Sequence, residues 1–278
     1  MNKRAAANRG TKLARREQRA GARLPYASHA DGATLLLRDG AVMQTLHLSG
    51  LAFETADTEE LNHRQAVRDT MLRAINNHQF TLYHHIVRRR VSPNLKGDFA
   101  DPVSAGIDRL WRARMGGKQL FVNELFLSIL YRPQAGKRGL LQRLGPRGKK
   151  YDDARRAQAV KTLNGAREGL MASLGAYGPR LLECYDGPGG RCSEPLEFLS
   201  LLYNGDLQPV IVPADDCGNY IPYNRTSFGA DALEQRGPGG SSLGCILSVK
   251  DYPSVTTPGV IDNLLRLPFE LVVSESFR

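Results

Sequence analysis

Cysteine, histidine and paired acids are the residue types that most often carry chemistry, and here few of them lie at a catalytic or metal-binding spacing. The four cysteines, Cys184, Cys192, Cys217 and Cys245, lie 8, 25 and 28 residues apart. None of them forms the close Cys pair that zinc ribbons and redox motifs require. We therefore expect buried or half-buried thiols of a reducing compartment.

The histidines and the acid pairs give no catalytic pattern. His84 and His85 are adjacent in a strand-like run, so we expect them on opposite faces of a sheet, where they cannot share an ion. The acids at 152–153 and 215–216 lie at a helix start and in a Gly-, Asn- and Pro-containing loop. Carboxylates at such places usually have structural roles. The sequence predicts neither a metal site nor a catalytic acid pair.

A phosphate-binding loop needs glycines at fixed spacing, followed by Lys and then Ser or Thr. The chain has Gly-Lys pairs at 117–118, 136–137 and 148–149, and none is followed by Ser or Thr. The run 237–242 (GPGGSS) lacks a lysine and is typical of a hairpin turn rather than an anion site. We therefore name no catalytic, cofactor-binding or metal-ligating residue in this chain.

The net charge of +10 is concentrated at the N-terminus. Residues 1–23 carry eight basic residues against the single acid Glu17, which leaves a nearly neutral body. Such an arm can contact anionic lipid, at about 1 kcal/mol per basic residue, or nucleic acid; the alternative is a solvated, frayed terminus. The candidate contact residues are Lys3, Arg4, Arg9, Lys12, Arg15, Arg16, Arg19 and Arg23.

The composition excludes two broad classes. With 41% apolar and 24% charged residues in 278, the chain is neither disordered nor a membrane bundle. No stretch approaches the roughly 20 apolar residues of a membrane span, and the basic start is not followed by the apolar run of a secretory signal. We expect the chain to be soluble.

The elements that would position functional residues follow from apolar periodicity and turn signals. Strands are expected in two parts of 33–51 around an Asp-Gly turn, and at 79–90, 121–132, 180–185, 209–212, 244–250 and 269–274. Helices are expected at 58–76, 101–116, 152–175, 194–203 and 258–267. The absence of strict βαβ alternation predicts an α+β fold with a mixed, largely antiparallel sheet, packed helices and a flexible basic N-terminal arm. We expect the arm to cover 1–23, the α+β module 24–278, and a basic mobile loop 134–150 within it.

Several stretches are distinctive in combination. They are 248–253 (SVKDYP), 256–259 (TTPG), 121–125 (FVNEL), 225–229 (RTSFG) and an opening segment from 24 to 55. Between about residues 24 and 277 they resemble the N-terminal region of the CagE/TrbE/VirB family, ATPases that energise type IV secretion and conjugation.

The resemblance implies a non-catalytic docking and assembly module that tethers an ATP-binding motor to inner-membrane subunits of a secretion channel. It implies a peripheral location on the cytoplasmic face of the bacterial inner membrane. Other implied partners are the motor domain itself, further copies of the chain and, weakly, anionic lipid; no small-molecule substrate is implied.

Family members use ATP and magnesium in a motor that follows this region, and these 278 residues lack its phosphate-binding loop. We therefore expect no cofactor and no hydrolysis from this chain alone. The sequence looks like a truncated product, a split gene or an excised domain.

A nucleic-acid-binding accessory protein is the alternative. It would use the arm together with the loop 134–150, which adds six basic residues and no acid. Its affinity for nucleic acid would fall steeply with salt.

Overall fold

The computed structural model describes most of the chain beyond the first 18 residues. The described ranges are 19–51, 57–75, 77–91, 97, 99–116, 120–134, 146–249, 254–255 and 263–277. Within them the chain forms an α+β fold, and every ladder of the main sheet is antiparallel, as the sequence predicts. The first 18 residues of the expected arm lie outside these ranges.

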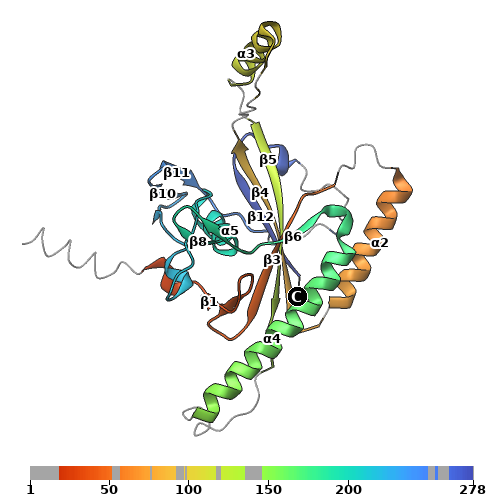
Figure 1. The fold of residues 1–278 in the computed structure, drawn as a ribbon, viewed down its shortest axis with the longest axis vertical. Helices are drawn as coiled ribbons and strands as arrows, with labels where there is room; N and C mark the ends of the chain where they lie inside the picture. The colour runs from red at the N-terminus through yellow and green to blue at the C-terminus, as the bar shows by residue number, and fades with distance from the viewer. Residues whose placement is uncertain are drawn as a thin grey trace, which may run out of the picture.

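A seven-stranded sheet forms the centre of the molecule (Figure 1). Its strands are β1 (Tyr26–His29), β2 (Leu35–Leu37), β3 (Val42–Leu48), β4 (Phe80–Val91), β5 (Leu120–Tyr131), β6 (Pro179–Leu181) and β12 (Leu271–Phe277). The strand order is β1-β2-β3-β5-β4-β12, with β6 paired to β3. The longest ladder joins β4 to β5 over twelve residue pairs, and these two strands lie in the middle of the sheet.

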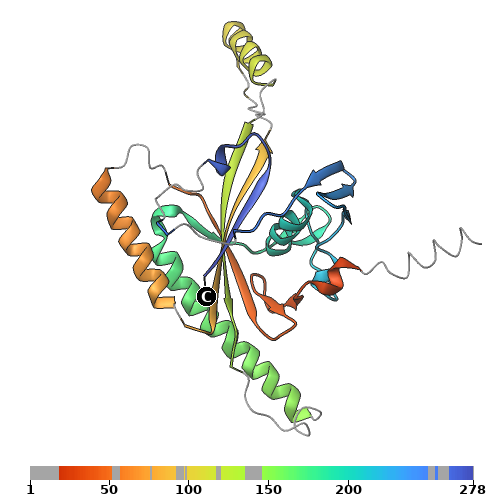
Figure 2. The same ribbon diagram turned by 180° about the vertical axis from the view of Figure 1, so that it is seen from behind.

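Helices cover both faces of this sheet. Figures 1 and 2 show α2 (Thr58–Ile75) and α4 (Pro146–Ser173) on one side and α5 (Glu194–Asn204) on the other. The helices begin where their side chains can satisfy free backbone donors. The Asp57 carboxylate accepts from the Glu60 N–H at 2.8 Å, as expected for the start of α2. Ser193 Oγ accepts from the Leu196 N–H at 3.2 Å at the start of α5.

Alternation along β5 explains why two cores form. Phe126 and Leu130 pack in the cluster on the α5 side, which includes Phe198 of that helix. Leu127 and Ile129 point the other way, into the cluster beneath α2 and α4. Because successive side chains of a strand point to opposite faces, a central strand buried on both sides reads as a continuous apolar run.

Two small sheets complete the α5 side. One is the pair β7 (Cys184–Gly187) and β8 (Gly190–Ser193), and the other contains β9 (Arg225–Phe228), β10 (Leu233–Gly237) and β11 (Gly240–Gly244). Gly237 lies opposite Gly240 at the end of the last hairpin. The glycine-rich run 237–242 therefore forms the predicted hairpin turn.

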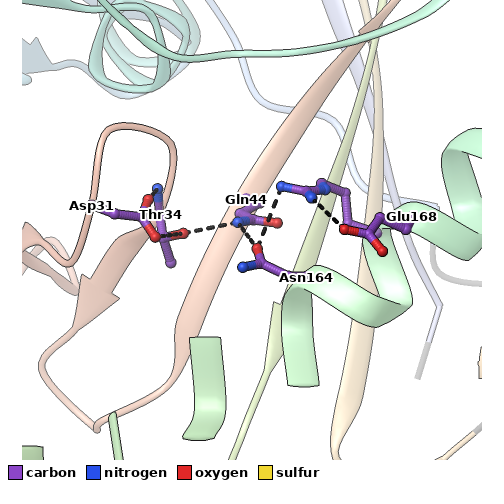
Figure 3. A network of polar contacts seen from close by, with 6 residues as sticks. Asp31, Thr34, Gln44, Asn164 and Glu168 are labelled. Atoms are coloured by element: carbon purple, nitrogen blue, oxygen red, sulfur yellow. Dashed lines mark hydrogen bonds and ion pairs between the residues drawn. The ribbon is translucent and has the colours of Figure 1, made fainter. Parts of the chain in front are cut away.

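A buried polar network attaches α4 to the sheet (Figure 3). Gln44 of β3 is 1% exposed, and its Nε2 donates both to Thr34 Oγ1 and to Asn164 Oδ1 of α4, each at 2.8 Å. The Thr34 hydroxyl in turn donates to the Asp31 carboxylate at 2.9 Å. Since buried polar groups cost free energy unless they are paired, this chain of bonds fixes where α4 sits on β3.

Several predicted boundaries were wrong. The helix α4 starts at Pro146 rather than at 152, so the last five residues of the expected mobile loop 134–150 are helical. Proline suits a first helical position because its missing N–H would have no partner there. Residues 135–145 lie outside the described ranges, as does the first half of the expected helix 258–267. In its second half, Leu264–Arg266 form a 3₁₀ turn, η5.

Three predicted strands also differ. The run 180–185 divides between β6 and β7, because its two ends pair with different partners. The segment 209–212 makes only an isolated bridge, from Ile211 to Cys192. The expected strand 244–250 does not form within the described residues: β11 ends at Gly244, and Ile246 and Leu247 are more than 80% exposed.

Candidate docking surfaces

Metal-ligating side chains do not cluster in the part of the chain that the structure describes. No group of three or more His, Cys, Asp or Glu residues in the described ranges could hold a metal ion. His84 lies 3.6 Å from Glu275, whereas the ring of His85 packs edge-on against Phe198, so the two histidines face opposite sides of the sheet as predicted. Nor does any helix in this part of the chain have the length and apolarity needed to cross a bilayer.

The cysteines are free thiols in different environments. Cys192 and Cys217 are buried and Cys184 is half-buried, as expected. Cys245 is exposed, and the expectation was wrong there because the residue follows β11 in a segment without a partner strand. Burial raises the pKa of Cys217 to about 11, so its thiol is not a nucleophile at neutral pH.

The paired acids have structural roles. Asp216 Oδ1 accepts from the Gly218 N–H at 3.0 Å and so caps the 3₁₀ turn η4 (Cys217–Asn219). The same carboxylate pairs with Arg38 at 2.6 Å. Asp153 lies 3.8 Å from Arg156 within α4.

Of the eight basic residues proposed as contact sites, the described ranges contain Arg19 and Arg23. Both are exposed; Arg19 precedes the 3₁₀ turn η1 (Ala20–Arg23), and Arg23 is its last residue. Gly21 in this turn is buried, so the last residues of the expected arm 1–23 are packed against the body. The other six, Lys3, Arg4, Arg9, Lys12, Arg15 and Arg16, lie outside the described residues.

A groove of about 430 Å³ separates β4 from the sheet β9–β11. Its main polar side chains are already bonded to other groups of the protein. Arg89 pairs with Glu124, and Arg88 Nε donates to the carbonyl oxygen of Leu267 at 2.8 Å. Asn204 Oδ1 accepts from two backbone N–H groups of the facing loop, at 3.2 and 3.1 Å. These groups do not converge on a substrate position.

The most distinctive surface is the helix α3 (Pro102–Gly116), which connects β4 to β5. Figures 1 and 2 show it standing clear of the sheet, beyond the ends of these strands. It starts as predicted, with the Asp101 carboxylate accepting from the Ser104 N–H at 2.8 Å. Its exposed apolar side chains are Val103, Ile107, Leu110 and Trp111. An amphipathic helix normally buries such a face, so α3 presents a surface suited to a partner.

Family models match both ends of the chain. The model described as "Type IV secretion system ATPase VirB4/TrbE, N-terminal domain" matches residues 33–138. The model "CagE, TrbE, VirB family, component of type IV transporter system" matches residues 180–278. The chain belongs to the CagE, TrbE, VirB family. This confirms the resemblance found in the sequence, and the central β4–β5 hairpin with α3 falls within the VirB4/TrbE N-terminal match.

The curated relatives are type IV secretion proteins. The chain is 31% identical over 262 residues to the type IV secretion system protein virB4 of Brucella suis, a match covering 91% of this chain and 32% of that protein. It is 30% identical over 258 residues to virB4 of Bartonella henselae, covering 91% and 33%. It is 29% identical over 287 residues to PtlC of Bordetella pertussis, covering 100% and 34%. The chain thus spans about a third of the length of these relatives.

The apolar face of α3 was not among the sites predicted from the sequence. The signal was present, because Val103, Ile107, Leu110 and Trp111 follow the i, i+4, i+7, i+8 spacing of one helix face. The same spacing occurs in helices whose apolar face is buried in a core, however. Only the position of α3 beyond the sheet distinguishes a docking face from a core face.

Proposed function

We propose that this chain is a docking and assembly module of a type IV secretion ATPase, which positions an ATP-binding motor against inner-membrane subunits of the channel. The observation that carries the proposal is the family match to the VirB4/TrbE N-terminal domain. The sequence itself contains no phosphate-binding loop. The module therefore contributes surfaces rather than hydrolysis, and ATP and magnesium belong to the motor.

The architecture supports this role. A body with two well-packed cores gives a rigid platform, and one side of that platform carries a helix whose apolar face is free of the body. Rigid elements that present an exposed apolar face are typical of protein or membrane contacts. In this proposal the module acts at the cytoplasmic face of the inner membrane as a peripheral protein.

Competition in cells tests the proposal. The chain 1–278 is overproduced in a strain carrying the complete secretion system from which it comes, together with the intact family ATPase. A docking module without a motor should occupy the docking positions and lower secretion or conjugal transfer at least tenfold. An unrelated soluble protein at the same level is the control. Unchanged transfer, with the chain folded and abundant, would contradict the proposal.

The nucleic-acid alternative rests on the arm and on the basic residues of 134–150. Filter binding to single- and double-stranded DNA over a salt series tests it with the same chain. Retention that survives near-physiological salt would favour the alternative. Loss at modest salt is the result expected for a docking module, because a few phosphate contacts are screened easily.

A further inference from the structure

The exposed face of α3 is apolar along its length. Val103, Ile107, Leu110 and Trp111 are 67%, 64%, 74% and 43% exposed, and their spacing places them on one face of the helix. Phe99, just before the helix, is 45% exposed. Both ribbon views show the helix beyond the end of the sheet, so the body leaves this face open (Figures 1 and 2).

The charged residues of α3 have one predominant sign. The helix carries Arg109, Arg112 and Arg114 against the single acid Asp108. Asp108 is paired at 2.6 Å with Arg112, one helical turn further on, and both residues lie on the side away from the apolar face. Arg109 and Arg114 are exposed, and within the described chain they have no acidic partner. The helix surface is therefore apolar and cationic at once.

We infer that α3 is an interfacial helix that inserts its apolar face into an anionic bilayer. Aliphatic side chains with a tryptophan on one face and arginines around them are the pattern by which helices lie in the headgroup region. Tryptophan prefers that boundary because one part of its ring system is apolar and its N–H is polar. In this arrangement the exposed side chains of Arg109 and Arg114 are available to lipid phosphates.

The length of the helix argues against a membrane-spanning orientation, and its charge argues against a contact with a second copy of the chain. Fifteen residues at 1.5 Å each span about 22 Å, less than the roughly 30 Å of a hydrocarbon core, so α3 lies along the surface rather than across it. A second copy of the chain would bring arginines of the same sign to the contact, and like charges disfavour such pairing. The inference rests on the proposed function and names the surface through which that module meets the membrane.

The chain offers a reporter at this site, because Trp111 is its only tryptophan. The full chain is mixed with vesicles of phosphatidylcholine containing phosphatidylglycerol, and with vesicles of phosphatidylcholine alone. Insertion of α3 predicts a blue shift of tryptophan emission and quenching by brominated acyl chains, with the anionic vesicles and much less with the zwitterionic ones. An unchanged emission spectrum while the chain cosediments with anionic vesicles would assign binding to the arm and overturn the inference.

A pair of matched variants tests the residues. Ile107→Asp with Leu110→Asp should weaken binding to anionic vesicles at least tenfold, since two apolar side chains no longer leave water. Phe228→Asp with Leu243→Asp makes the same charge change at residues 81% and 78% exposed on the small sheet, and should bind as the unaltered chain does. Equal loss in both pairs would overturn the inference. Circular dichroism and the melting temperature check that both variants are folded.

The competition assay separates this inference from the proposed function. If vesicle binding does not involve α3 but the chain still inhibits transfer, the docking module stands and the membrane assignment fails. If the α3 variant loses inhibition of transfer although the unaltered α3 does not enter vesicles, its occupant is a protein and the inference is wrong. If α3 enters vesicles and the chain does not inhibit transfer, the proposed function fails instead.

Discussion

The backbones of Gly21 and Gly218 lie in direct contact, although the two residues are far apart in the sequence. A methyl group on Gly21 would lie 2.4 Å from the carbonyl oxygen of Gly218, and one on Gly218 would lie 2.7 Å from the carbonyl oxygen of Gly21. Arg38 reinforces the contact: it pairs with Asp216, and its Nε donates to the carbonyl oxygen of Leu24 at 2.8 Å. The turn η1 is thereby attached to the turn η4.

Substitution of either glycine should destabilise the fold. Gly21→Ala places a methyl group against backbone that cannot move aside, so the free energy of unfolding should fall by about 1–3 kcal/mol. Gly169→Ala is the control. Gly169 lies within α4 with nothing within 4 Å of an added methyl group, and alanine there should raise the free energy of unfolding by up to about 1 kcal/mol. Urea denaturation measures both, and an unaffected Gly21→Ala would contradict the close contact.

The contact between Gly21 and Gly218 determines how much of the basic arm can be deleted without loss of stability. Deleting residues 1–18 should leave the melting temperature unchanged, because the packed turn η1 remains. Deleting 1–23 should lower the melting temperature, because Gly21 and the acceptor for Arg38 Nη2 are lost with it. Thermal unfolding of the two truncations compares them directly. Equal melting temperatures would show that η1 contributes no stability.

The network around Gln44 predicts a difference between two substitutions at Asn164. Asn164→Ala removes the acceptor for the buried Gln44 Nε2, and the unpaired donor should cost about 1–3 kcal/mol of unfolding free energy. Asn164→Asp keeps an acceptor at the same position, beside the Arg167 guanidinium, which donates to it at 3.4 Å. It should lose much less stability. Chemical denaturation distinguishes them, and equal losses would mean that the bond to Gln44 is not stabilising.

Local signals in the sequence predicted much of the fold. The helix starts near residues 58 and 101 were correct, and in the structure the Asp57 and Asp101 carboxylates accept from the N–H groups three residues further on. The Asp-Gly turn between β2 and β3 and the strand β5 were also predicted correctly, because a turn and an apolar run are both formed by adjacent residues. Each of these features depends on neighbours in the chain, which the sequence displays directly.

The incorrect predictions concern features that depend on residues far apart in the sequence. Residues 180–185 form two short strands because one end pairs with β3 and the other with β8, and neither partner is adjacent in sequence. The contact of Gly21 with Gly218 is likewise invisible without the fold. The spacing of the apolar residues of α3 can be recognised in the sequence, but their exposure depends on the distance of the helix from the sheet. The candidate site was therefore missed although the helix itself was predicted.

His85 lies on the α5 side of the sheet, in a setting that opposes its protonation. Its Nδ1 lies 2.8 Å from Ser274 Oγ of β12, and its ring packs edge-on against Phe198 with centroids 5.5 Å apart. Burial, with a smaller contribution from the neighbouring His84, lowers the pKa of His85 from 6.5 to about 4. Burial also lowers the pKa values of His29 and His47. Burial therefore favours the neutral form of all three rings in the folded protein.

This shift predicts a loss of stability in mild acid. Between pH 6.5 and 4 the unfolded chain binds a proton at His85 that the folded chain does not, so the free energy of unfolding should fall as the pH falls through this window. After allowance for partial solvent screening, His85 should account for about 1 kcal/mol between pH 7 and pH 5. His85→Asn should flatten the dependence, whereas His63→Asn, on the exposed side of α2, should leave the slope as in the unaltered chain. Urea unfolding at a series of pH values measures the slopes. Equal slopes for His85→Asn and the unaltered chain would show that the ring is protonated as readily in the fold as in the unfolded chain.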